Sequence, residues 1–511
     1  MKMKRIFAFM LAVVMCLSVL AGCSIKPSSS DTPSGEVSGE VSDETSKETN
    51  NVATKEDGQK DDGQKDDGQK DDGKKDDDKK DDKDDDKNDT RKPGRDQELE
   101  LVPVPQASTN FVKGVTDAKS TFAGKTIQFY AAETWGHDSD NKKILYPQLA
   151  KDYGLRVIVK PSVIYRDVLQ NIQEIKARKQ IDLIGVGHEK LPSVYAIMQP
   201  LNNKINLDKA PEGLNKSLME DTMKGNDIMY LPQYGSEGIV YNVNNIKQAG
   251  KEEPFDLQVK GQWTWDKFAE YVKFFTEDND KNGQPEKWGF GSWERTLHEF
   301  ALTNNTGYYT YNADGTVTSN ITTDAVVQSM NFVKELHGKN KAFYFFKGLG
   351  NYPEFYTDES VTMLKMGAPH NPKDLQYGMV AMPKGPNPGS ENIVTTQGTG
   401  YGLPATMVKK QNEKAALLLQ AYMLDYRVDQ VKRGWEVIYG ANPRWEEQFD
   451  VVYGGKTPTK ILILYGVGSI ESKIGIIEQA MKDDSKSMEQ TVQSLKNIFE
   501  NEARKVYTIG S

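Results

Sequence analysis

The chain has 511 residues, 37% of them hydrophobic and 27% charged, which is enough for one large or two medium domains. Residues 1–23, 24–54 and 55–92 carry net charges of +3, −4 and −5, so only −3 of the formal −9 remains on residues 93–511. This nearly neutral body lacks the basic excess that nucleic-acid binding needs, so we expect no nucleic-acid partner.

Both cysteines of the chain lie near its start, at Cys16 and Cys23. The body therefore has no disulfide, no cysteine-ligated zinc site and no thiol nucleophile. Basic residues precede an apolar run at residues 6–21. That run is too short for a stable membrane span and fits the core of a signal peptide.

The apolar run ends in Leu20-Ala21-Gly22-Cys23, which resembles the lipobox of bacterial lipoproteins. The resemblance implies a signal peptide at residues 1–22, cleavage before Cys23 and diacylation of the Cys23 sulfur, with palmitate as the expected kind of acyl group. The protein is then expected on the extracellular face of the bacterial cell membrane, held by a lipid anchor and not by a membrane span. An ordinary secretory signal with a chance cysteine is the alternative.

Low-complexity sequence follows the signal. Residues 24–54 are rich in Ser, Thr, Glu and Gly, and residues 55–92 consist almost entirely of Asp, Lys, Gly and Gln in near-repeating pentads. No hydrophobic residue lies between Ala53 and Leu99, so burial cannot offset the chain entropy there. We therefore predict a disordered linker over residues 23–110. The Asp-rich pentads also suggest calcium binding, but each pentad contains a lysine, and the order of ligands found in an EF-hand is missing.

From Phe111 the composition becomes globular. Short apolar segments at residues 125–130, 155–159 and 181–186 predict strands, and residues 144–153 and 165–178 between them predict helices. This alternation predicts an α/β fold with a parallel sheet. Further helices are expected at residues 265–275, 325–337, 413–426 and 488–505. The body is too long for one simple sheet, so two lobes that exchange chain are expected.

Three segments of the body combine recognisable motifs in a fixed order. The first contains Leu231–Tyr234, Gly238–Asn242 and Ile246–Gly250; the second contains Trp263–Phe268, the acidic turn Asp278–Gly283 and Trp288–Phe290; the third contains Tyr377–Pro386 and Thr399–Pro404. In order and spacing they resemble the extracellular solute-binding proteins of family 1, the sugar- and oligosaccharide-binding lipoproteins of bacterial ABC importers. The resemblance covers residues 120–511.

This resemblance implies a two-lobed, periplasmic-binding-protein-like (type II) fold with hinge crossings. Mapped onto this chain, one lobe comprises residues 111–236 plus 400–442, and the other comprises residues 237–399 plus 443–511. The crossings are expected near Tyr234–Tyr241, Thr396–Gly402 and Tyr439–Arg444. The glycine-rich segment at the second crossing has the backbone freedom that a hinge needs.

The loops after the expected strands supply the candidate solute contacts, since ligands of open α/β sheets bind at the carboxyl ends of strands. Aromatic planes can cover the apolar faces of a sugar, while carboxylates, amides and histidine bind its hydroxyl groups. Core packing is the alternative for each tryptophan, and a solvated loop charge is the alternative for the glutamates. The candidates are Glu133 and Trp135, His188 and Glu189, Gln233 and Tyr234, Trp293 and Glu294, and His370.

The acidic turn Asp278–Gly283 also invites a test for calcium binding, because it matches the first positions of a calcium-binding loop. Gly289 stands where the loop should supply a bidentate glutamate, and Pro285 stiffens its eighth position. We therefore predict a turn without metal.

The sequence thus predicts a monomeric receptor without a cofactor, which captures a carbohydrate, expected to be an oligosaccharide, and delivers it to the transmembrane subunits of an ABC permease. There are two alternatives within the same class of protein. The solute is a small molecule other than a sugar, or the receptor reports its solute to a membrane sensor and does not supply an importer. A surface glycoside hydrolase that uses Glu133 and Glu294 is a third class. The chain has neither a Gly-x-Ser-x-Gly nor a His-Glu-x-x-His motif, and we predict that it is not an enzyme.

Overall fold

The computed structural model divides the chain into residues 1–89, none of which it describes, and residues 90–511. The predicted signal peptide, Cys23 and almost all of the predicted linker and of the helix at 165–178 lie outside the described residues. The described residues are 106–131, 141–161, 177, 180–188, 191, 194–233, 235, 237–293, 296–312, 316–346, 360–366, 375–396, 398–407, 409–461, 471–483 and 485–510.

The folded body begins before the residue that the sequence predicted. Helix α2 (Gln106–Phe111) lies in the last part of the predicted linker, apart from its final residue. Thr109 and Phe111 are buried, and the neighbouring Val112 forms a β-bridge with Ile205. The linker prediction was therefore wrong at residues 106–110, because this short and mostly polar helix is held by contacts with distant parts of the chain, among them α13.

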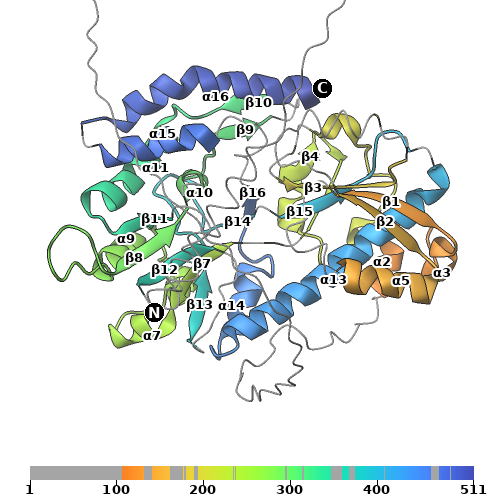
Figure 1. Ribbon diagram of the computed structural model, residues 1–511, viewed down its shortest axis with the longest axis horizontal. Helices are drawn as coiled ribbons and strands as arrows, with labels where there is room; N and C mark the ends of the chain where they lie inside the picture. The colour runs from red at the N-terminus through yellow and green to blue at the C-terminus, as the bar shows by residue number, and fades with distance from the viewer. Residues whose placement is uncertain are drawn as a thin grey trace, which may run out of the picture. The chain divides into compact units, whose positions relative to one another are not determined.

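The first of two five-stranded sheets has the strand order β2-β1-β3-β15-β6 (Figure 1). Strands β1, β2 and β3 are parallel, and β15 pairs antiparallel with both β3 and β6. We call this sheet and the elements packed on it the first lobe. Its strands are β1 (Thr126–Ala131), β2 (Arg156–Pro161), β3 (Leu183–Gly187), β6 (Leu231–Pro232) and β15 (Thr399–Gly402).

Local sequence signals set several ends of the first-lobe helices. The Asp117 side chain accepts hydrogen bonds from the Lys119 and Ser120 N–H groups at the start of α3 (Ala118–Phe122). Helix α5 (Tyr146–Tyr153) ends at Gly154, whose φ of 71° is the left-handed conformation that glycine adopts without strain. A π-helical turn (Asn141–Leu145) precedes α5.

The second sheet has the order β11-β8-β12-β7-β13, and with its helices it forms the second lobe. Strands β8, β11 and β12 are parallel, while β7 runs antiparallel to β12 and β13. The strands are β7 (Gly238–Asn242), β8 (Trp288–Ser292), β11 (Phe343–Phe345), β12 (Val361–Met366) and β13 (Tyr377–Val380). Helices α9 (Trp265–Phe274), α10 (Thr296–Thr303), α11 (Asp324–Lys334) and α16 (Met488–Gly510) contribute to its largest core.

Two short segments of chain connect the sheets directly. Residues 233–237 lead from β6 of the first sheet to β7 of the second, and β14 (Val394–Thr396) leads back to β15. The two crossings pair with each other, because Glu237 and Thr395 exchange backbone hydrogen bonds of 2.7 and 3.2 Å. Strand β16 (Thr459–Ile461) adds to β14 in parallel, and its Lys460 forms an ion pair with Asp221 of the first lobe.

The third connection is a single long helix, α13 (Glu413–Tyr439). Figure 1 shows it running from beside α2 to α14 (Trp445–Val452). Its residues up to Leu424 belong to the core of the first lobe, whereas Val431, Trp435 and Tyr439 pack with residues of the second. The helix therefore changes lobe in its middle and not at Tyr439–Arg444, since the sequence has no break that stops the helix earlier.

Smaller elements complete the described part of the chain. None of its helices combines the length and the hydropathy needed to span a bilayer. The remaining helices are α7 (Val243–Gln248), α8 (Pro254–Val259) and α15 (Glu471–Lys482), the remaining strands are β4 (Met223–Lys224), β5 (Asp227–Ile228), β9 (Tyr309–Tyr311) and β10 (Val317–Ser319), and short turns of helix lie at Tyr195–Ile197, Leu207–Lys209, Lys216–Leu218, Glu220–Thr222, Glu335–Lys339 and Lys410–Asn412.

Candidate functional site

The crossings join the carboxyl edges of the two sheets. In the first sheet β1, β3 and β6 run in the same direction and end at one edge, where the antiparallel β15 begins. In the second sheet β8 and β12 end at the edge where β7 begins. Because residues 233–237 run from the end of β6 to the start of β7, both carboxyl edges lie at the crossings. This is where the strand topology of an α/β fold places a ligand.

Two of the predicted site residues meet at the second crossing. His188 follows β3, and its N–H donates to the Gly398 carbonyl oxygen at 2.9 Å. Gln233 follows β6; its N–H donates to the Thr399 carbonyl oxygen at 3.2 Å, and its Oε1 accepts from the Tyr401 hydroxyl at 2.7 Å. The structure thus brings His188 and Gln233 together on either side of residues 398–401.

His188 and Gln233 are both buried, at 0% and 3% exposure. The His188 ring packs edge-on against Tyr230 with 5.6 Å between centroids, and burial lowers its pKa to about 3. The backbone of Gln233 partly opposes that shift. Neither ring nitrogen, however, makes a hydrogen bond of good geometry with the described residues. Direct contact of either side chain with a solute would therefore require movement of the second crossing.

Trp293 is the one partly exposed member of the three described candidates. It follows β8 at the carboxyl edge, and its ring lies 5.9 Å from that of Phe346. The other candidates, Glu133, Trp135, Glu189, Tyr234, Glu294 and His370, lie outside the described residues, and their roles stay predictions.

The crossings also hold a buried ion pair that the sequence analysis did not predict. Lys365 on β12 and Glu299 on α10 are both fully buried, with 3.0 Å between Lys365 Nζ and Glu299 Oε1. Lys365 Nζ also donates to the Thr395 hydroxyl at 3.0 Å and to the Glu237 carbonyl oxygen at 3.1 Å, and the Thr395 hydroxyl donates to Glu299 Oε1 at 2.8 Å. The available signal was one lysine in the otherwise uncharged strand 361–366.

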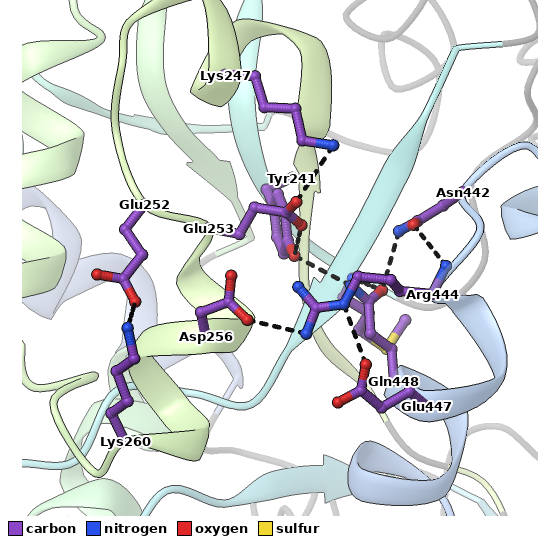
Figure 2. Close-up of polar contacts among 11 residues, drawn as sticks. Tyr241, Lys247, Glu252, Glu253, Asp256, Lys260, Asn442, Arg444, Glu447 and Gln448 are labelled. Carbon is purple, nitrogen blue, oxygen red and sulfur yellow. Dashed lines mark hydrogen bonds and ion pairs between the residues drawn. The ribbon is translucent and has the colours of Figure 1, made fainter.

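A second polar network fixes the segment that follows α13 onto the second lobe, as Figure 2 shows. The Gln448 amide donates to the Tyr241 hydroxyl at 3.2 Å, and that hydroxyl donates to Glu253 Oε2 at 2.9 Å. Arg444 lies between Asp256 and Glu447, at 2.8 and 3.0 Å. Further contacts link Gln448 with Asn442 and Met379, Asn442 with the Tyr377 carbonyl, Lys247 with Glu253, and Lys260 with Glu252.

The acidic turn brings three carboxylates close together. Oxygen atoms of Asp278, Asp280 and Glu286 lie within 4.8 Å of one another. Each also accepts a backbone hydrogen bond: Asp278 from Gly283, Asp280 from Asn282, and Glu286 from Asn279. These bonds provide a physical reason for the turn that does not involve a metal ion, and the turn without metal stays a prediction.

A buried histidine on α10, the helix that carries Glu299, makes the stability of the protein depend on pH. His298 on α10 is 1% exposed, packs on Tyr308 with 4.6 Å between ring centroids, and has a pKa lowered by burial to about 3. Between pH 6.5 and 3 the unfolded chain therefore binds a proton that the folded protein does not, so stability falls as the pH falls.

Replacing His298 by leucine should remove this proton uptake. We expect the loss of unfolding free energy below pH 6.5 to shrink by about 1.4 kcal/mol per pH unit. Urea unfolding of the wild type and of His298→Leu at several pH values between 7 and 4 measures the difference. Parallel pH profiles for the two proteins would show that His298 is not held neutral in the folded state.

Comparison with known proteins identifies the fold. No family model and no curated protein match this chain. Among solved structures, the sugar-binding protein MalE of Xanthomonas citri is 12% identical with a TM-score of 0.56, over 75% of this chain and 98% of that one. MsmE of Bacillus subtilis, a binding protein in an open conformation, is 14% identical with a TM-score of 0.53, over 75% and 99%. An ABC substrate-binding protein of Listeria monocytogenes in complex with cycloalternan is 13% identical with a TM-score of 0.51, over 74% and 98%.

The chain therefore has the two-lobed α/β fold of periplasmic binding proteins, as the sequence predicted. At these identities the comparisons show the fold and leave the solute of this chain open. The neighbours match almost their whole length to about three quarters of this chain.

Proposed function

We propose that the chain is a lipid-anchored, extracellular solute-binding receptor that captures a carbohydrate between its two lobes and delivers it to an ABC permease. The observation that carries the proposal is the arrangement of the crossings, which join the carboxyl edges of both sheets. A solute bound there contacts both lobes at once, and only such shared contacts favour closure.

The chemistry at these edges suits a sugar. Trp293 supplies a partly exposed aromatic plane at the second-lobe edge, and Glu237, whose side chain is 22% exposed, supplies a carboxylate at the first crossing. Aromatic planes and carboxylates are the pair of groups that bind the apolar faces and the hydroxyl groups of carbohydrates. Two of the structural neighbours are described as a sugar-binding protein and as a complex with cycloalternan, which supports the same class of solute.

Trp293→Ala should weaken sugar binding about tenfold or more, because it removes an aromatic plane from the candidate site. Isothermal titration calorimetry with the sugar that most stabilises the protein measures the effect. Trp288→Ala is the matched control: Trp288 lies at the opposite end of the same strand and packs on Tyr344, with 4.7 Å between ring centroids. Equal affinities of Trp293→Ala and Trp288→Ala would remove Trp293 from the site.

The anchor can be tested separately from the binding. Cys23→Ala should move the protein from the membrane fraction into the medium or a soluble fraction, because the lipid anchor needs the Cys23 sulfur. Immunoblotting of cell fractions measures the distribution, and Cys16→Ala is the matched control because residue 16 lies inside the predicted signal. A Cys23→Ala protein that stays on the membrane would contradict the lipid anchor.

A further inference from the structure

Lys365 contacts both of the short crossings, although it lies in neither. Its Nζ donates to the backbone of Glu237 in the first crossing and to the Thr395 side chain in the second. Its partner Glu299 accepts from the same Thr395 hydroxyl. The two crossings, which pair through Glu237 and Thr395, are thereby fastened to β12 and α10 of the second lobe.

We propose that Lys365 and Glu299 form a positioning pair that holds the first two crossings in register and so sets the range of lobe movement. The inference rests on the proposed function only in that it gives this movement a purpose. In a hinge protein, a few residues at the crossings absorb the change of backbone angles between open and closed forms. Hydrogen bonds from a fixed pair to these residues restrict which backbone angles they can adopt. We call Lys365 and Glu299, with their bonds to Glu237 and Thr395, the clasp.

The contacts of the Lys365 ammonium group favour a specific positioning role, because it donates a hydrogen bond to each of the two crossings and lies next to the Glu299 carboxylate. An ammonium group has three donors, and here Glu299 Oε1, the Thr395 hydroxyl and the Glu237 carbonyl lie at 3.0, 3.0 and 3.1 Å. Burial of two charges is costly, and a packed apolar pair in their place is often as stable. An apolar pair, however, would make no directed bond to either crossing, so the charged pair provides geometry that hydrophobic packing does not.

The partly exposed end of this network lies at the first crossing. The Glu237 carboxylate is 3.5 Å from Lys365 Nζ and has 22% of its side chain exposed, whereas Lys365 and Glu299 are fully buried. The Glu237 carboxylate can therefore exchange Lys365 for water or a solute while the buried pair stays intact. This places the fixed part of the clasp on the second lobe and the adjustable part at the crossing.

Spin labels, one in each lobe, measure the movement directly without a ligand. The full chain, with Cys16 and Cys23 changed to serine, receives cysteines at the exposed positions Lys151 on α5 and Asp266 on α9. Pulsed electron–electron double resonance then gives the distribution of distances between the two spin labels. We expect the Lys365→Met/Glu299→Gln double variant to shift the distribution or to make it about twofold wider, because the crossings lose their directed bonds.

Two further variants separate positioning from folding. Thr395→Val removes only the hydroxyl that joins the pair to the second crossing, and it should change the distribution in the same direction. Lys251→Met removes a surface ion pair with Glu270 in the same lobe and should leave the distribution unchanged. Folded double and Thr395→Val variants with wild-type distributions would overturn the proposal.

The ligand-free readout keeps this test independent of the proposed function. Maltotriose, added as a probe in a second set of measurements, reports whether the wild-type lobes close on a sugar. If maltotriose had no effect, the distances measured without ligand would still decide whether the clasp restricts the lobes. If the variants left those distances unchanged, sugar binding would still be tested separately by calorimetry.

Discussion

Lys365→Met is expected to lower the free energy of unfolding by about 3–5 kcal/mol, because the Glu299 carboxylate then stays buried without its cation. Methionine keeps most of the side-chain volume, so the change removes charge and hydrogen bonds and leaves little cavity. Urea unfolding at pH 7 measures the effect, provided that the slope with denaturant stays constant.

The double variant Lys365→Met/Glu299→Gln distinguishes a missing cation from a packing defect. It removes both charges, so we expect it to recover most of the stability that the single variant loses. Lys251→Met, which breaks an exposed pair, should cost no more than about 1 kcal/mol. A single variant as stable as Lys251→Met would contradict the buried pair.

Gly378→Ala is expected to destabilise the protein by about 3 kcal/mol, because a Cβ at this position would lie 2.2 Å from the Tyr241 ring. Tyr241 cannot easily move aside, since it is fully buried and its hydroxyl contacts both Glu253 and Gln448. The substitution should therefore also loosen the segment around residues 442–448. Thermal unfolding measures the stability, and hydrogen exchange of residues 442–448 measures the loosening.

Gly434→Ala is the matched control for this change. Gly434 lies inside α13, five residues before its end, and apart from its chain neighbours and the backbone of its own helix no described atom lies within 4 Å of the position where its Cβ would be. Alanine in a helix interior is favoured over glycine by about 0.5–1 kcal/mol, so Gly434→Ala should stabilise the protein. If the two substitutions had effects of the same sign and size, the close approach of Gly378 to Tyr241 would be wrong.

The sequence predicted those elements whose ends are marked by local chemistry. The helix expected at residues 265–275 begins as predicted, and the hydroxyl of the preceding Thr264 accepts from the Lys267 N–H at the start of α9. The helix expected at residues 144–153 ends as predicted, at Gly154 in the left-handed conformation. Trp263 and Trp265 are large and mainly apolar, and both are buried, with indole N–H groups that donate to Ala381 and Thr303. In these cases the deciding partner is close in sequence or the side chain is large and apolar.

Features set by distant contacts were not predicted. Helix α13 continues to Tyr439 because its second half finds a new core, with Phe449 and Tyr453, after it leaves the first. Val428, Val431, Trp435 and Ile438 recur at helical spacing in that half, a signal that the predicted helix end at residue 426 did not take into account. The start of the body at α2 depends in the same way on contacts with Ile205 and α13.

In the candidate site, too, the positions of residues along the strands could be predicted, whereas their burial and their distant partners could not. The rule that ligands bind at carboxyl ends of strands led to the choice of His188 and Gln233, and the structure places both at one edge of one sheet. It could not show that both are buried, because their burial depends on the return of residues 398–401 across that edge. The pairing of Lys365 with Glu299 needed two residues 66 positions apart to face each other, which no local pattern indicates.

Thermal unfolding of the protein with a panel of solutes tests the central claim most directly. The panel contains mono- and oligosaccharides, amino acids, peptides, polyamines and calcium. A solute at 100 times its dissociation constant adds about 2.7 kcal/mol, which raises the melting temperature by a few degrees. We predict a shift confined to one series of sugars, with the sugar recovered intact. A shift with a non-sugar alone would contradict the carbohydrate assignment, and recovery of a cleaved sugar would contradict the receptor.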